Sequence, residues 1–111
     1  MHMQVFETLA DPMRRRIVEA LRRGEQPVND IVQRLEIHQS GVSRHLRILE
    51  HAGFVRVRPH GSQRFYSLRP EPFQELERWL SSYRGLWEAR LDRLALALEK
   101  RKATKSPARK D

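Results

Sequence analysis

The chain contains no cysteine, and this absence excludes disulfide bonds, thiolate-bound metal centres and a cysteine nucleophile. Long apolar runs are also missing, because no stretch approaches the roughly 20 residues that a helix needs to cross a bilayer. The opening residues Met1–Gln4 contain no charged segment followed by an apolar one, so we expect no signal peptide. Together these absences favour a cytoplasmic protein without membrane association.

Positive charge is abundant. The 111 residues include 22 Lys and Arg against 14 Asp and Glu, which gives a net charge of +8. Such an excess favours a polyanionic partner, which is DNA, RNA or an anionic membrane surface. Half of it lies in residues 99–111, which we expect to form a disordered basic tail. Residues 1–98 have the length of one folded domain, and a domain this short gains stability from a second copy.

Apolar residues recur at helical spacing through the first half of the chain and predict four helices. Two lie within the first 23 residues. Asp11-Pro12 between them is typical of a helix start, because Asp caps free backbone N–H groups and Pro fits the first turn. A short third helix opens at Pro27. A three-residue turn, Glu36–His38, separates it from a fourth helix that runs from about Gln39 to Ala52.

Beyond this point the apolar period changes from 3.6 to 2. Phe54–Arg58 and Gln63–Leu68 alternate around Pro59–Ser62, which predicts two strands joined by a turn. A last helix follows, with large side chains at near-heptad spacing: Phe73, Leu76, Leu80, Tyr83, Trp87, Leu91, Leu94 and Leu98. The predicted fold class is therefore mainly α with a small β-hairpin, in the order α-α-α-α-β-β-α of a winged helix-turn-helix.

The fourth helix carries side chains suited to reading DNA. Away from Val42, Leu46 and Leu49, we expect an outer face of hydrogen-bond donors: Gln39, Ser40, Ser43, Arg44 and Arg47. Arg suits guanine, Gln suits adenine, and the helix N-terminus attracts phosphate. His45 either joins this face from its flank or packs under the hairpin. The alternative is an ordinary solvated face, but such faces usually mix both charges, and no carboxylate precedes Glu50 here.

The predicted hairpin is basic as well, through Arg56, Arg58, His60 and Arg64. Alternation places Val55 and Val57 on one face and the first two arginines on the other. We expect the basic side chains to contact phosphates or the adjacent minor groove. Edge strands also carry charge that discourages aggregation, and both roles can hold at once.

The run Ile37–Val55, IHQSGVSRHLRILEHAGFV, resembles the helix-turn-helix of the ArsR/SmtB family. The family pattern is Gln-Ser/Pro-x-Val/Ile-Ser-x-His-Leu, then Leu, then Ala-Gly-Leu-Val. Asp11–Ile17 is similar to its Asp-Pro-x-Arg-x-x-Ile segment, and Gly61 with Phe65–Leu68 is similar to its wing. The resemblance covers about residues 3–98. It implies a sequence-specific dimeric repressor that leaves its operator on double-stranded DNA when an inducer binds.

The sequence departs from the family at both of the family's metal sites. Many members bind metals or arsenicals through Cys-Val-Cys at the third helix, where this chain has Pro27–Asn29. Others bind zinc through Asp/His and His/Glu pairs on the last helix, which has no His here. We therefore expect no metal and no cofactor. A metal-responsive repressor with atypical ligands stays open as an alternative, with His2 and an acid elsewhere as its candidate ligands.

The apolar stripe of the last helix is longer than so small a domain can cover, which favours a partner. The resemblance implies that the first and last helices of two subunits pack together, through Phe6, Leu80, Tyr83, Trp87, Leu91, Leu94 and Leu98. Two alternatives remain. The helix folds back on its own domain, or Trp79 and Trp87 line a pocket for a small-molecule inducer.

No pattern indicates an enzyme, because nothing resembles a nucleophile elbow, a phosphate loop or a pair of catalytic carboxylates. Ser43 and His45 lie two residues apart on one helix and point to different sides. A remaining alternative is a winged helix that binds RNA or protein and has no operator. An acidic or apolar recognition face would favour that alternative, and this face is basic and polar.

Overall fold

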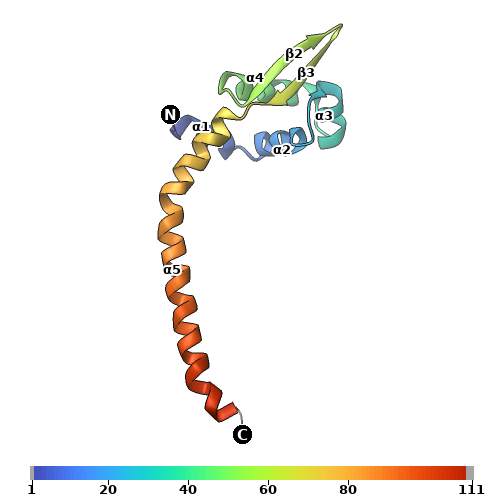
Figure 1. Cartoon of the computed structure of the whole chain (residues 1–111). Coiled ribbons are helices and arrows are strands. Elements are labelled where there is room, and N and C mark those ends of the chain that lie inside the picture. The colour runs from blue at the N-terminus through green and yellow to red at the C-terminus, as the bar shows by residue number, and fades with distance from the viewer. Residues whose placement is uncertain (1, 110–111) are drawn as a thin grey trace. The chain divides into compact units, whose positions relative to one another are not determined.

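A computed structural model describes the backbone of residues 2–109 and the side chains of residues 4–103 (Figure 1). The chain divides into two compact units, the first reaching Leu76 and the second beginning at Glu77. Its elements are α1 (His2–Ala10), α2 (Pro12–Leu21), β1 (Gln26–Pro27), α3 (Val28–Leu35), α4 (Gln39–His51), β2 (Val55–His60), β3 (Gln63–Leu68) and α5 (Glu71–Arg109).

The order of the elements confirms the predicted winged helix-turn-helix, with one strand added. Strand β1 pairs antiparallel with β3, in the register Gln26 to Tyr66 and Pro27 to Phe65, and gives a three-stranded sheet in the order β1-β3-β2. A two-residue strand has no alternating pattern to detect. Its proline is tolerated because β1 lies at the edge of the sheet.

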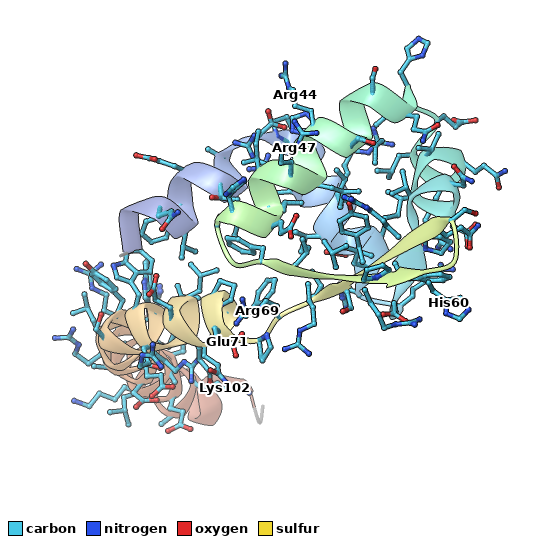
Figure 2. All side chains as sticks on the ribbon, turned by 90° about the horizontal axis from the view of Figure 1, so that it is seen from above. Arg44, Arg47, His60, Arg69, Glu71 and Lys102 are labelled. Atoms are coloured by element: carbon cyan, nitrogen blue, oxygen red, sulfur yellow. The ribbon has the colours of Figure 1, made fainter. Side chains whose placement is uncertain are left out.

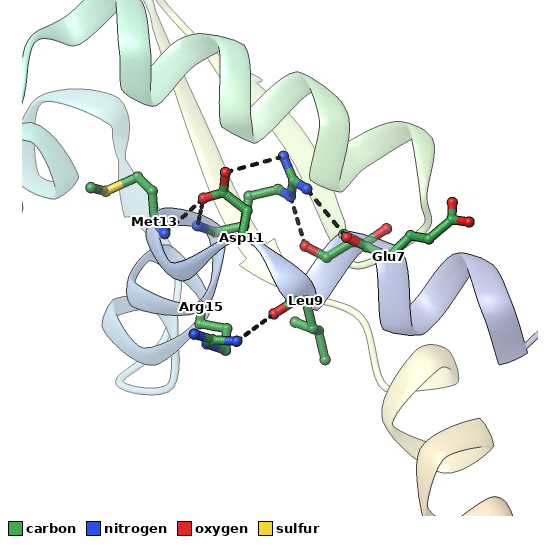
Figure 3. A network of polar contacts seen from close by, with 7 residues as sticks. Glu7, Leu9, Asp11, Met13 and Arg15 are labelled. Carbon is green, nitrogen blue, oxygen red and sulfur yellow. Dashed lines mark hydrogen bonds and ion pairs between the residues drawn. The ribbon is translucent and has the colours of Figure 1, made fainter.

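The connection between α1 and α2 is built from reciprocal caps (Figure 3). The carboxylate of Asp11 accepts hydrogen bonds from the backbone N–H groups of Met13 at 2.7 Å and Arg14 at 3.2 Å, as predicted for the start of α2. In return, Arg14 donates from Nε to the carbonyl oxygen of Thr8 at 2.7 Å, and Arg15 donates to that of Leu9 at 2.9 Å. The free carbonyls at the end of α1 are thereby satisfied.

The core of the first unit lies between the helices and one face of the sheet. Its fully buried side chains are Ile17, Leu21, Ile31, Val42, Leu46, Leu49, Phe54 and Val55. Burial of each such side chain contributes about 1.5–3 kcal/mol. Phe54 also meets the ring of Phe73 edge-on, with ring centroids 5.5 Å apart, which attaches the first turn of α5 to this core.

The hairpin turn is tighter than the sequence predicted. We expected a turn over Pro59–Ser62, but β2 continues to His60, which pairs with Gln63 and leaves a two-residue turn. Gly61 has a φ of 63°, whereas Ser62 has no positive φ. This is the pattern of a type II′ turn, in which glycine takes the first central position. Pro59 can remain within β2 because that strand, too, is an edge of the sheet.

In the second unit α5 continues without interruption to Arg109. This differs from the disordered tail predicted for residues 99–111, of which Lys110 and Asp111 lie outside the described residues. Lys, Arg and Ala dominate here, and these residues have high helix propensity. A separate role for residues 99–111 beside residues 1–98 stays a prediction. No helix in the described part of the chain is both long enough and apolar enough to cross a bilayer.

Candidate DNA-binding surface

The inner face of α4 fixes the direction in which its outer face points. Val42, Leu46 and Leu49 are completely buried, as predicted. Ile48, whose side the pattern left open, is 37% exposed. The outer face therefore presents the expected polar side chains: Gln39, Ser40, Arg44 and Arg47 are exposed, and Ser43 is half-buried. Figure 2 shows Arg44 and Arg47 on α4 and His60 at the far end of the hairpin.

The first turn of α4 has free backbone donors. Its N-cap residue, His38, makes no side-chain hydrogen bond to the helix, and the first turn contains no acidic side chain. The N–H groups of this turn have no acceptor within the helix. A helix start of this kind attracts anions, because both the N–H groups and the helix dipole favour negative charge.

A hollow of about 370 Å³ separates α4 from strand β3. Its lining comes from β1, α3, α4, the turn and β3: Pro27, Val28, Asn29, Gln39, Ser43, Arg47, Glu50, Ser62, Gln63, Arg64 and Tyr66. Arg47 and Arg64 border it from opposite sides. Among the described side chains, neither forms an ion pair. The hollow is therefore polar and carries two available guanidinium groups.

Seven residues that line this hollow were not predicted as site residues: Pro27, Val28, Asn29, Glu50, Ser62, Gln63 and Tyr66. Asn29 belongs to the first turn of α3, and β1 sets its position beside β3. No sequence pattern pointed to Asn29 as a site residue, because its position depends on β1, and a two-residue strand has no pattern of its own. Gln63 and Ser62 are brought to the hollow by the tighter turn.

The basic side chains of the hairpin do not share one face of the sheet. Arg64 pairs with Pro59 in the strand register and lies two residues from buried Tyr66, so it is on the core side. Arg56, Arg58 and His60 alternate with Val55, Val57 and Pro59 and lie on the other side. The phosphate contacts predicted for the hairpin therefore divide between two faces.

Arg58 is already engaged within the protein. Its Nη2 donates to one carboxylate oxygen of Glu25 at 2.8 Å, and its Nε donates to the other at 3.0 Å. The guanidinium also lies over the ring of Phe65, 5.0 Å from the centroid, and the His60 ring meets the same phenyl edge-on at 6.0 Å. Hydrogen bonds from Arg58 hold the pKa of Glu25 below its usual value, and Glu25 in turn raises the pKa of Arg58.

His45 on α4 acts electrostatically on Asp11 at the start of α2. It is half-buried, and its Nδ1 atom is buried without a hydrogen-bond partner among the described residues. Burial opposes ionisation of Asp11. The hydrogen bonds that its carboxylate accepts from the backbone N–H groups of Arg14 and Met13 outweigh that effect, and the nearby charges of His45 and Arg14 act in the same direction. The pKa of Asp11 is therefore below its usual value. His45 therefore lies near the Asp11 cap.

The residues predicted to form a dimer interface are exposed apolar side chains. Those on α5 are between 47% and 60% exposed: Leu80, Tyr83, Trp87, Leu91, Leu94 and Leu98. Phe6 on α1 is 38% exposed. The pairing of these side chains with a second copy stays a prediction.

The described side chains contain no cluster of three or more His, Asp or Glu that could hold a metal ion. The side chain of His2, which the sequence left as a candidate ligand, lies outside the described side chains. Pro27–Asn29, which takes the place of the family's thiolate motif, forms the junction of β1 and α3. That junction offers no thiolate, imidazole or carboxylate.

Known proteins share both the sequence and the fold. Residues 9–58 match a family model described as a helix-turn-helix domain. The transcriptional repressor SdpR of Bacillus subtilis is 30% identical over 79 residues, which are 71% of this chain and 88% of that protein. A transcriptional repressor SmtB homolog of Synechocystis sp. is 35% identical over 80 residues, 72% of this chain and 61% of that repressor. The chain thus spans less than two thirds of this second relative.

A crystal structure of an ArsR family transcriptional regulator matches with a TM-score of 0.68 and 32% identity, over 77% of this chain and 88% of that one. With the helix-turn-helix of α3 and α4 and the hairpin of β2 and β3, these similarities define a DNA-binding transcriptional regulator of the winged helix-turn-helix class. The chain belongs to the ArsR/SmtB family.

Proposed function

We propose that this regulator is a repressor that binds operator DNA as a homodimer, with α4 in the major groove and the hairpin against the neighbouring backbone. The hollow between α4 and β3 carries the proposal. Arg47 and Arg64 border it without ion-pair partners among the described side chains. A sugar-phosphate strand that passes between a recognition helix and a wing meets such donors from both sides. SdpR and the SmtB homolog, both named as repressors, support the repressor role.

The side chains divide between two tasks in this proposal. Bases are read by donors on the outer face and first turn of α4: Gln39, Ser40, Ser43 and Arg44. Phosphates are bound by Arg47 and Arg64, with Arg56 and His60 toward the adjacent groove. Arg58, which the sequence suggested as a phosphate contact, keeps Glu25 as its partner. His45 supports the position of α4 near Asp11 and makes no base contact.

The homodimer is proposed because α5 exposes six large apolar side chains along one face. A stripe of this size on a small protein is typical of an interface. Phe6 on α1 adds a seventh exposed side chain to the proposed contact.

We propose that release from DNA follows a small-molecule inducer and not a metal. The chain has no thiol, and its described side chains form no metal-binding cluster. Zinc titration tests this directly, since a metal-responsive repressor would lose DNA affinity as zinc is added. We propose no catalytic role, and a place in the cytoplasm with its operator.

The experiment that tests the function is binding of the full chain to DNA from upstream of its own gene, compared with random duplex, at about 0.1 M and 0.2 M salt. Sequence-selective binding that persists at the higher salt is the expected result. Equal binding to both duplexes, lost at the higher salt, would overturn the proposal, because basic charge alone would then account for the affinity.

A further inference from the structure

A mainly apolar hollow of about 450 Å³ lies on the first unit, between α2, the end of β3 and the start of α5. Its lining consists of Val18, Glu19, Arg22, Leu68, Arg69, Pro70 and Phe73. All of these residues belong to the first unit, so the hollow is complete without the second. Its volume falls within the roughly 300–1,000 Å³ of small-molecule sites, which typically combine apolar walls with a few polar groups.

The charged side chains of this lining leave one cation in excess. Glu19 and Arg22 neutralise each other in an ion pair of 2.8 Å. The other cation is Arg69, and Figure 2 shows it with Glu71 where the chain enters α5. Glu71 lies 3.3 Å from the Nε atom of Arg69 but does not line the hollow. This Nε atom is buried and has no hydrogen-bond partner among the described residues. A carboxylate in the hollow would therefore meet a guanidinium with an unsatisfied donor.

Two contacts connect this hollow to the end of α4 through Phe54, which is fully buried. The backbone N–H of Arg69 donates to the carbonyl oxygen of Phe54 at 2.8 Å, and the Phe54 N–H donates to that of Leu49 in α4 at 2.9 Å. The ring of Phe73, which forms part of the lining, also meets the Phe54 ring edge-on. A ligand that displaces Arg69 or Phe73 would therefore act on the last turn of α4.

We propose that this hollow is the inducer site and that it takes an amphipathic monocarboxylate. The aromatic or branched apolar body of the ligand lies against Val18, Leu68 and Phe73, and its carboxylate binds Arg69. This inference rests on the proposed release of the repressor by a small molecule, and it adds the site and the chemical class. The single cation in excess favours a monoanion, because a dianion would need a second cation and Arg22 is paired with Glu19.

Isothermal titration calorimetry of the full chain with 2-naphthoate tests the site, with 2-naphthamide as the matched ligand that lacks the charge. The acid should bind about tenfold more tightly than the amide, because only the acid offers Arg69 a charged acceptor. Arg69→Met should remove this preference. Arg23→Met removes an exposed arginine of α2 outside the lining and should keep it. Phe73→Leu should weaken both ligands by the same factor, because it removes apolar contact alone.

The same probe tests the connection to DNA binding. Saturating 2-naphthoate should lower the affinity of the unmodified chain for DNA from upstream of its own gene by about fivefold or more. Failure of both ligands to bind at about 1 mM would overturn the site. Equal binding of acid and amide, or a preference that survives in Arg69→Met, would overturn the carboxylate class. Binding without any loss of DNA affinity would overturn the inducer role.

Failure of the proposed function would be recognised separately. A chain that does not select its upstream DNA when no probe is present is not the proposed repressor, whatever the calorimetry shows. Calorimetry on the DNA-free chain still decides whether the hollow binds a carboxylate, so the two failures are distinguishable.

Discussion

Arg58 on β2 and Glu25, just before β1, form a bidentate ion pair across the intervening strand β3, with N–O distances of 2.8 Å and 3.0 Å. The pair joins the hairpin to the loop before β1 and uses a cation that the sequence suggested for DNA. Arg64, on the opposite face of the sheet, has no such partner among the described residues.

We expect Arg64→Ala to weaken binding to operator and random DNA by a similar factor, roughly tenfold near 0.1 M salt, because one phosphate contact is lost. The slope of log affinity against log salt should fall by about 1. Fluorescence anisotropy over a series of salt concentrations measures both quantities. Arg58→Ala is the matched control and should leave the slope unchanged. If the slope falls by the same amount in both variants, the division of the hairpin cations between two faces is contradicted.

The Glu25–Arg58 pair should make stability depend on pH. Because Arg58 lowers the pKa of Glu25 below its ordinary 4.5, the ionised carboxylate stabilises the folded chain above that pH. This contribution is lost as the pH falls through the lowered pKa. Glu25→Gln should therefore melt at a lower temperature than the unmodified chain near pH 7, and the difference should shrink near pH 3. A difference that is constant over this range, in thermal melts followed by circular dichroism, would count against the pair.

Arg44→Ala should weaken operator binding by about 1–3 kcal/mol, the usual contribution of a good base contact. Arg44 is exposed on the outer face of α4, opposite the buried side chains of that helix. Competition titrations with operator and random duplex provide the measurement. Equal loss on both duplexes would assign Arg44 to the phosphates and remove it from base reading.

Asp11→Ala should lower the melting temperature by roughly 4–8 °C, because the first turn of α2 loses its cap. Asp11→Asn is the control, since Asn caps nearly as well and differs only in charge. A large loss in both variants would show that the negative charge beside Arg14 and His45 matters more than the hydrogen bonds to the backbone.

Leu91→Glu should convert the dimer into a monomer, because the charge would lie within the apolar stripe of α5. Leu96→Glu makes the same change at an equally exposed leucine outside the stripe and should leave the dimer intact. Light scattering at matched concentrations distinguishes the two. A Leu91→Glu variant that remains dimeric would place the interface elsewhere.

Features that depend on local residue patterns could be predicted from the sequence. The Asp11 cap follows from a two-residue signal, and the inner face of α4 follows from the spacing of Val42, Leu46 and Leu49. Features that depend on distant residues could not. Strand β1 exists because β3 pairs with it, and Arg58 meets Glu25, 33 positions earlier in the chain. The assignment of individual side chains to bases or phosphates stays a prediction.

The uncapped start of α4 has a consequence for the motion of the free protein. His38 supplies no side-chain acceptor, so the amides of Gln39, Ser40 and Gly41 are left to solvent until an anion reaches them. A DNA phosphate at this point would act as the missing cap. The recognition helix should therefore fray at its first turn in the free state and become ordered on the operator, and slower hydrogen exchange of these three amides in the complex would record the change.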